Sequence, residues 1–340
     1  HEIPIGDLEP DKEYNYTVNY GKNQLTYSFK TAPTPGTRKP FTFAFTSDSR
    51  AGSGGGERNI YGVNVYIMKK MAALAAQQGA SFFQFTGDMI TGYSSSIGSN
   101  MLEYANWKRS VESIWHYLPI YVAMGNHEAL VNIFDDGSAW GISIDKFPFK
   151  TKSAETIFSN NFVNPQNGPQ SEDSAYYDPD KSKLNFPEYG ESVYSYIYDN
   201  IAIVVLNSNY WYTPTKKMIS EIGGNPHGYV MDNQLLWFEK KINELNSNSH
   251  IDHIFVTIHT PAFPNGGHAK DDMWYYGNNK IRPTVAGEPV NVGIIERRDE
   301  LLDIMINKSD KVIALLCGDE HNYSRMKLTK NTPIYPEGYK

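Results

Sequence analysis

Five short segments of the sequence contain side chains of the kinds that bind metal ions, and each segment follows an apolar run. They are Asp48, Gly87-Asp88, Gly125-Asn126-His127-Glu128, His259 and Gly318-Asp319-Glu320-His321. Carboxylates bind hard cations well, and imidazoles suit Zn, Fe or Mn. One such residue after a strand is commonly a helix cap or a turn former. Five in register instead predict one hydrolytic site with two metal ions, since ligands bind beyond the carboxyl ends of strands in an open α/β sheet.

A site of this kind has a defined chemistry. Two cations about 3.5–4 Å apart neutralise negative charge on a substrate and lower the pKa of a bridging water towards ~7. The expected reaction class is therefore hydrolysis by a metal-bound hydroxide.

The elements that must position these side chains alternate between strands and helices from residue 41 onward. Apolar runs predict strands at 41–46, 82–85, 119–124, 193–198, 201–206, 254–258 and 311–317. Helical periodicity predicts helices at 63–78, 102–118, 233–245 and 294–306. The alternation is typical of an α/β layer fold. Two long polar segments, 129–190 and 261–290, predict loops that form the walls of a substrate site.

The first 36 residues have a different pattern. Alternating residues on both sides of Gly21-Lys22-Asn23 predict a β hairpin. Leu8-Glu9-Pro10 followed by Tyr14 resembles the end of a fibronectin type III or immunoglobulin-like sandwich. We expect a partial β segment and linker at 1–36 and the catalytic domain at 37–340.

The five segments resemble those of the calcineurin-like metallophosphoesterase superfamily and, within it, the purple acid phosphatase branch. The resemblance covers residues 41–328, and Gly125-Asn126-His127-Glu128 is its most specific part. It implies an α/β sandwich of two mixed β-sheets packed face to face, with helices outside. The implied cofactors are two divalent ions (Mn, Fe or Zn), or one bound ion. The implied substrate is a small phosphate ester, with monoester and diester both open.

The resemblance also assigns roles to single residues. Asp88 would bridge the two metals. Asp48 and His321 would bind the first metal. Asn126 and His259 would bind the second, together with Asp319.

Three more residues would act on the substrate. His127 would stabilise the leaving or phosphoryl oxygen, and His268 would contact the substrate from nine residues beyond His259. Arg50 is expected to hold the phosphoryl group, and Asn126 is expected to bind the substrate in addition to the metal.

The sequence departs from the family pattern at the first metal. Asp48-Ser49-Arg50 replaces Asp-x-His or Asp-x-Gly, and the final Gly-His-x-His reads Gly318-Asp319-Glu320-His321. Thr91 stands where purple acid phosphatases have a metal-binding Tyr, and Tyr93 lies two residues further on. Arg50 has three open roles: gripping phosphate oxygens bidentately, replacing a metal, or pairing with Asp48 or Asp88. We expect Glu320 to face outward.

These departures motivate a second hypothesis, a degenerate relative that binds a phosphorylated ligand or a glycan without turnover. His116, His227, His250 and His253 match no motif and are expected at the surface or in loops.

Composition limits the remaining classes. The formal net charge of −7 argues against nucleic-acid binding through phosphate contacts. The sequence lacks a run of about 20 apolar residues, the length that spans a bilayer. A removed signal peptide is compatible with the start at His1, and together with the β segment it predicts a secreted, periplasmic or cell-surface protein. The sequence does not indicate an oligomeric state.

Overall fold

The structure is a computed structural model. It describes residues 2–51, 59–93, 96–129, 153–179, 181–184, 186–212, 224–267, 272–285 and 287–332. His268 therefore lies outside the described residues, and so do most of the Gly-rich segment after Arg50 and the first part of the 129–190 segment.

One sheet consists of three parallel strands in the order β3-β6-β7: β3 (Thr42–Thr46), β6 (Ala80–Thr86) and β7 (Ile120–Ala123). The central strand β6 has consecutive buried residues from Phe82 to Thr86. A strand that is covered on both faces requires such a continuous run rather than an alternating one.

The second sheet is mixed and has the order β13-β10-β9-β8. Its strands are β8 (Tyr194–Tyr198), β9 (Ile201–Val205), β10 (His253–Thr257) and β13 (Val312–Leu316). β8 and β9 form the expected antiparallel hairpin around Asp199-Asn200, whereas β9, β10 and β13 are parallel.

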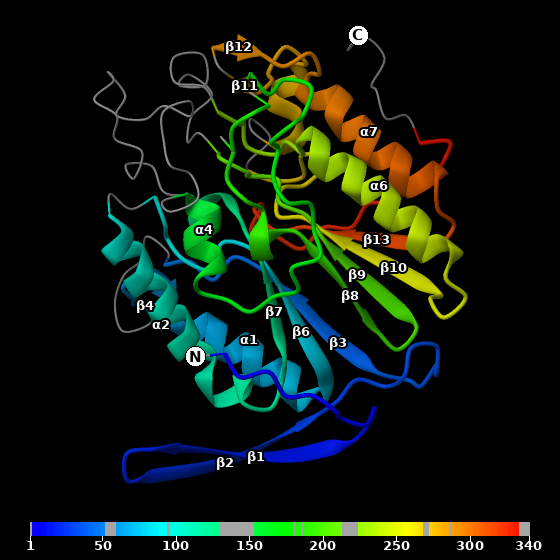
Figure 1. Ribbon diagram of the computed structural model, residues 1–340. Coiled ribbons are helices and arrows are strands. Elements are labelled where there is room, and N and C mark those ends of the chain that lie inside the picture. Colours follow the sequence, from blue (N-terminus) through cyan, green and yellow to red (C-terminus); the bar gives the residue numbers. More distant parts are fainter. Residues whose placement is uncertain are drawn as a thin grey trace.

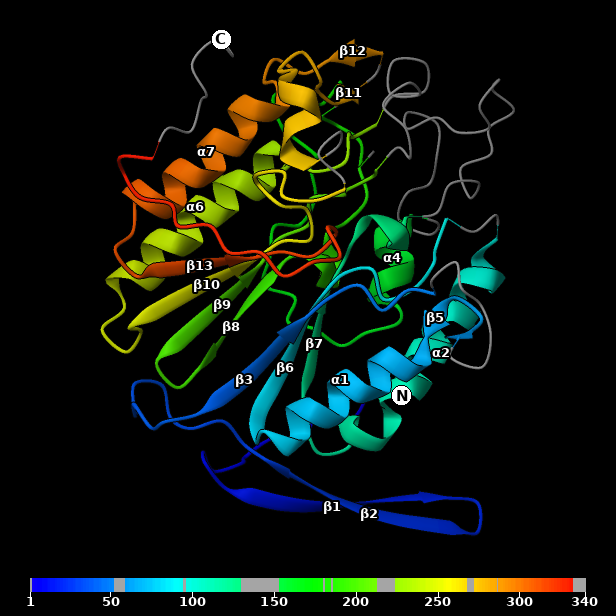
Figure 2. The same cartoon turned by 180° about the vertical axis from the view of Figure 1, so that it is seen from behind.

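Helices cover the outer face of each sheet (Figures 1 and 2). α1 (Val65–Gln77) and α2 (Ile97–Trp115) lie against the first sheet, and α6 (Asp232–Ser247) and α7 (Ile294–Asn307) lie against the second. The predicted α/β sandwich of two sheets flanked by helices is confirmed.

Three apolar clusters hold these layers together, one under each pair of helices and one between the sheets. Phe82 from β6 and Ile203 from β9 belong to the cluster between the sheets. Two buried hydroxyls also join the sheets, because the Oγ1 atoms of Thr86 and Thr257 lie 2.7 Å apart at the ends of β6 and β10. The two strand ends that lead into the candidate site are thereby fixed to each other.

The predicted hairpin in the first 36 residues is confirmed as β1 (Glu13–Tyr20) and β2 (Asn23–Lys30), paired over their full length. It contacts the rest of the chain at the end of α2, where the ring of Tyr27 stacks on His116 at 3.9 Å between centroids. The division into two domains stays a prediction.

Several predicted boundaries are wrong. The first helix starts at Val65 because the preceding pair Val63–Asn64 forms β5, which pairs with β4 (Asn59–Ile60). α2 begins at Ile97 because the Ser96 hydroxyl accepts a hydrogen bond from Ser99 N and caps the helix.

The two long polar segments contain short elements that the sequence analysis did not predict. These are α4 (Ala154–Ser159), η3 (Gly190–Ser192), η4 (Asp272–Gly277), β11 (Thr284–Val285) and β12 (Glu288–Pro289). α4 is fixed to the rest of the fold through Glu155, which is buried and whose carboxylate accepts a hydrogen bond from Trp211 N at 2.7 Å. Among the described helices, none is both long and apolar enough to cross a membrane.

Candidate metal centre

The five sequence segments meet at one edge of the two sheets, as predicted. Asp48 follows β3, Asp88 follows β6, and Asn126 begins η1 (Asn126–Glu128) after β7. His259 follows β10, and the segment of Asp319 follows β13. These strands are parallel to their neighbours within each sheet, so each sheet delivers its ligands from one edge.

Four side chains form a buried group. Asp88, His259 and Asp319 each offer a ligand atom within 4.8 Å of the others. His259 Nε2 lies 3.2 Å from Asp88 Oδ1, 3.7 Å from Asp319 Oδ1 and 3.1 Å from Asn126 Oδ1. Each of these residues is less than 8% exposed. We call Asp88, Asn126, His259 and Asp319 the buried group.

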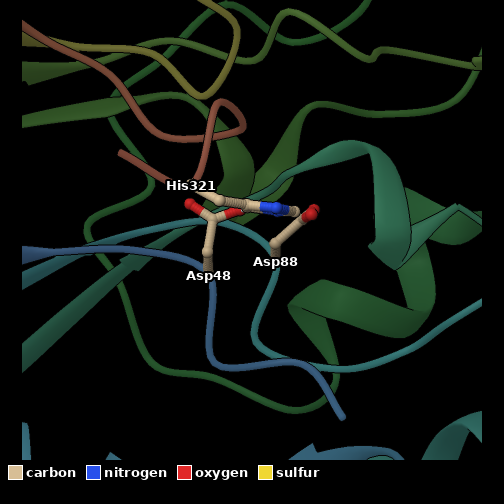
Figure 3. A group of neighbouring side chains, drawn as sticks. All are labelled: Asp48, Asp88 and His321. Atoms are coloured by element: carbon tan, nitrogen blue, oxygen red, sulfur yellow. The ribbon is translucent and has the colours of Figure 1, made fainter. Parts of the chain in front are cut away.

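Asp88 also belongs to a second set with Asp48 and His321, in which the ligand atoms again lie within 4.8 Å (Figure 3). His321 Nε2 lies 3.4 Å from Asp48 Oδ1, and the His321 side chain is 42% exposed. We call Asp48 and His321 the outer pair. The two sets share Asp88, which is the position predicted for a bridging carboxylate.

Backbone carbonyls orient the buried imidazole of His259 and the partly buried imidazole of His127. His259 Nδ1 lies 2.7 Å from Thr86 O, and His127 Nδ1 contacts Thr91 O. A carbonyl oxygen only accepts, so Nδ1 holds the proton in both rings and Nε2 is directed into the site. Metal-binding histidines commonly donate their second ring N–H in this way.

The backbone around the site is strained. Asp48, Asp88, Asp319 and His321 all have positive φ values, between 53° and 72°. Such conformations cost non-glycine residues roughly 1 kcal/mol or more each and gather at functional sites. Gly87 is required at φ 83°, since an added Cβ would lie 2.6 Å from Gly125 N.

Glu128 fixes the two central loops to each other. Its buried carboxylate accepts hydrogen bonds from Gly125 N, Asp88 N and Met89 N at 2.6–3.0 Å. Burial, and after it the neighbouring charge of Asp88, raise the pKa of Glu128 to about 8, although His259 and the backbone donors act to lower it. Glu128 therefore positions Asp88 and Asn126 without reaching the metal side.

The electrostatics of the buried group favour a cation. Burial raises the pKa of Asp88, but the imidazoles of His259 and His127 outweigh it and hold the pKa below its usual range. Burial lowers the pKa of His259, yet Asp88, Asp48 and Asp319 raise it well above its ordinary value. Buried carboxylates persist only when they are paired or bind a metal. A divalent ion fits this group through two carboxylates, one amide oxygen and one imidazole nitrogen, whereas the outer pair offers fewer ligands.

Arg50 lies beside the shared carboxylate. Its Nε is 3.6 Å from Asp88 Oδ2, and its backbone N donates to Asp88 O at 3.1 Å. The ion pair, one of three predicted roles, is present.

Sequence reasoning did not place His227 at the site. His227, expected at the surface or in a loop, lies in a turn but is buried, and its Nε2 lies 3.7 Å from Asp319 Oδ2 and 3.0 Å from Thr260 Oγ1. No motif marks it, because the 224–231 segment reaches the site only through the tertiary fold. Tyr93 lies beside the site: its hydroxyl accepts a hydrogen bond from Asn126 Nδ2, and its ring centroid lies 4.6 Å from that of His127.

Glu320 also differs from expectation. It is 7% exposed rather than outward-facing, and its carboxylate lies 3.5 Å from Asn265 N. The positive φ of its neighbours Asp319 and His321 turns Glu320 away from the ligands and toward the 265–266 loop.

No curated protein matches the sequence, whereas solved structures show similarity to it. A solved structure of PhoD superposes with a TM-score of 0.52 at 17% identity, covering 92% of this chain and 58% of that one. A dimetal phosphatase from Danio rerio gives a TM-score of 0.44 at 12% identity, covering 83% of this chain and 82% of the other. At these identities the likeness is one of fold, and this chain spans little more than half the length of PhoD.

The family comparison is decisive. The model of the calcineurin-like phosphoesterases matches residues 41–323, which contain all five segments and both sheets of the sandwich. This chain therefore belongs to the calcineurin-like phosphoesterase family.

Proposed function

We propose that this protein hydrolyses phosphate esters with the help of at least one divalent metal ion. The observation that supports the proposal most strongly is the convergence of Asp88, Asn126, His259 and Asp319 in a buried group at the strand ends. A divalent ion bound there would neutralise phosphate charge and lower the pKa of a water molecule. Mn, Fe and Zn are the candidate ions, because the ligands combine oxygen and nitrogen atoms.

The side chains around this group have distinct roles in the proposal. Arg50 binds phosphoryl oxygens through its guanidinium, which presents donors in a fixed fork. His127 holds or releases a proton at Nε2, 3.8 Å from Asp88 Oδ2, beside the position of the leaving oxygen. Asn126 presents Oδ1 to the metal side. A substrate contact by His268 is retained from the sequence.

The test is hydrolysis of a panel of phosphate monoesters and diesters by the purified protein loaded with Mn²⁺ or Zn²⁺. In Asp88→Asn we expect the rate to fall about a thousandfold, which corresponds to roughly 4 kcal/mol of transition-state stabilisation. Asp310→Asn is a matched control because Asp310 is 94% exposed and outside both ligand sets. Unchanged hydrolysis in Asp88→Asn would contradict the proposal.

The same experiment separates hydrolysis from binding without turnover. A protein that binds less than one metal ion per chain and hydrolyses none of the esters would support the degenerate relative instead. Export from the cell and kinship with the purple acid phosphatases stay predictions, the former to be checked by cell fractionation.

A further inference from the structure

The two oxygens of Asp88 face different partners. Oδ1 accepts a hydrogen bond from His127 N at 3.1 Å and lies 3.2 Å from His259 Nε2. Oδ2 lies 3.6 Å from Arg50 Nε. One oxygen therefore belongs to the buried group. Oδ2 would face a metal bound between Asp48 and His321. It already has a permanent positive charge beside it, because the Arg50 guanidinium stays protonated in proteins.

The outer pair is partly satisfied without a metal. Asp48 Oδ2 accepts hydrogen bonds from the Ser47 hydroxyl and from Asp319 N, the latter at 3.0 Å. Its other oxygen, Oδ1, is buried without a hydrogen-bond partner and faces His321 Nε2 at 3.4 Å. Groups of the protein therefore face both oxygens of Asp48.

Backbone contacts hold Arg50 in this place. Ser49 N and Arg50 N both donate to Asp88 O, at 2.8 and 3.1 Å. Arg50 also forms an antiparallel bridge with Val63, a fully buried residue. The side chain is only 27% exposed, and its position is built into the fold rather than adopted at a free surface.

The charges of the site balance with a single divalent ion. Three carboxylates, those of Asp48, Asp88 and Asp319, face the two ligand sets. One divalent ion and the Arg50 guanidinium together supply three positive charges. A second divalent ion would leave an excess of two and would lie next to the guanidinium.

We propose that this protein retains one divalent ion, in the buried group, and that Arg50 supplies the positive charge that a first metal would otherwise provide. The inference rests on the proposed function, since the guanidinium and the single ion would hold the phosphate ester between them. The protein is then a one-metal variant of a two-metal architecture, with the outer pair as a remnant of the lost site.

The test counts metal ions in the full chain rather than measuring activity. The protein is stripped with a chelator, loaded with Mn²⁺, passed through gel filtration and assayed for Mn by elemental analysis. We expect one Mn per chain in the wild type and two in Arg50→His, because the imidazole adds a ligand and removes the permanent charge. Arg50→Lys is the matched control that keeps the charge, and we expect one ion there.

Electron paramagnetic resonance gives a second readout. One isolated Mn²⁺ gives a six-line signal, which we expect in the wild type and in Arg50→Lys. Exchange coupling between two neighbouring ions should suppress that signal in Arg50→His. Arg50→Gln is a second neutral variant if the histidine variant does not fold, and it should take up a second Mn²⁺ at a concentration at least tenfold lower than Arg50→Lys does.

The outcomes distinguish this inference from the proposed function. Two retained ions in the wild type would overturn the role of Arg50 and leave the hydrolase intact. The same conclusion would follow if every folded Arg50 variant retained one ion and bound a second Mn²⁺ at the same concentration as Arg50→Lys. One ion per chain with no hydrolysis of any ester would keep the inference and remove the hydrolase.

Discussion

His259 and His321 are both imidazoles placed by parallel strands of one sheet, but their surroundings differ. β10, which precedes His259, lies inside the order β13-β10-β9-β8, whereas β13, which precedes His321, is at its edge. His259 is fully buried, and the His321 side chain is 42% exposed. The same contrast appears in the other sheet, where central β6 leads to buried Asp88 and edge strand β3 leads to Asp48.

Burial, rather than strand position alone, sets the dielectric surroundings of each ligand, because Asn126 and Asp319 follow the edge strands β7 and β13 and are nonetheless buried. Charges in the buried group attract cations more strongly than they would in water. His321 meets solvent, which weakens the same attraction. The buried group should therefore bind a metal far more tightly than the outer pair.

The strongest test of this contrast exchanges each imidazole for an amide. We expect His259→Asn to weaken Mn²⁺ binding by more than about a hundredfold, because it removes a ligand from the buried group. The matched variant His321→Asn should change it by less than about tenfold. Competition with a fluorescent chelator measures both affinities, and equal losses would refute the distinction between the two sets.

Metal removal should show the contrast in stability. A ligand that binds only the folded state at 100 times its Kd stabilises it by about 2.7 kcal/mol. Chelation should therefore lower the melting temperature of the wild type and of His321→Asn, but leave His259→Asn nearly unchanged. Differential scanning calorimetry with and without chelator checks this, and a melting temperature indifferent to chelator in the wild type would count against the buried group as a metal site.

His227 provides a test behind the buried group. Its Nε2 lies 3.0 Å from Thr260 Oγ1 and 3.7 Å from Asp319 Oδ2, so we expect it to position Asp319 rather than to bind the metal. Loss of such a partner commonly costs 10–100-fold in metal affinity. We expect about tenfold weaker Mn²⁺ binding in His227→Phe and a smaller loss in His227→Gln, which retains a hydrogen-bonding group. Equal affinities in all three proteins would show that Asp319 is held by other contacts.

The smallest expected effect comes from Tyr93. Its hydroxyl accepts a hydrogen bond from Asn126 Nδ2, which leaves Oδ1 directed at the buried group. In Tyr93→Phe the amide is free to rotate, and we expect a loss of Mn²⁺ affinity of up to about tenfold. The free energy of unfolding of the stripped protein, measured in urea, should change by about 1 kcal/mol or less. A large loss of stability with unchanged affinity would assign Tyr93 to packing.

The sequence predicted most of the fold for a local reason. Apolar runs followed by Gly-Asp or Gly-Asn-His marked the strand ends, and helical periodicity marked the helices that cover the sheets. Boundaries were less certain, as at α2, where the Ser96 cap extended the helix beyond its apolar pattern. The turn of Glu320 away from the site was unpredictable, because it depends on the backbone conformation of its two neighbours.

The sequence by itself determined the chemistry available at the site: which residues are carboxylates, amides and imidazoles, and that each follows a strand. The tertiary structure decided which of those residues can bind a metal and which form other contacts. It placed two of the five strands at sheet centres and three at edges, brought His227 next to Asp319, and set Arg50 against one oxygen of Asp88. These relations depend on packing between segments far apart in the chain, where burial and proximity turn the same residue types into either a metal ligand or an ion pair.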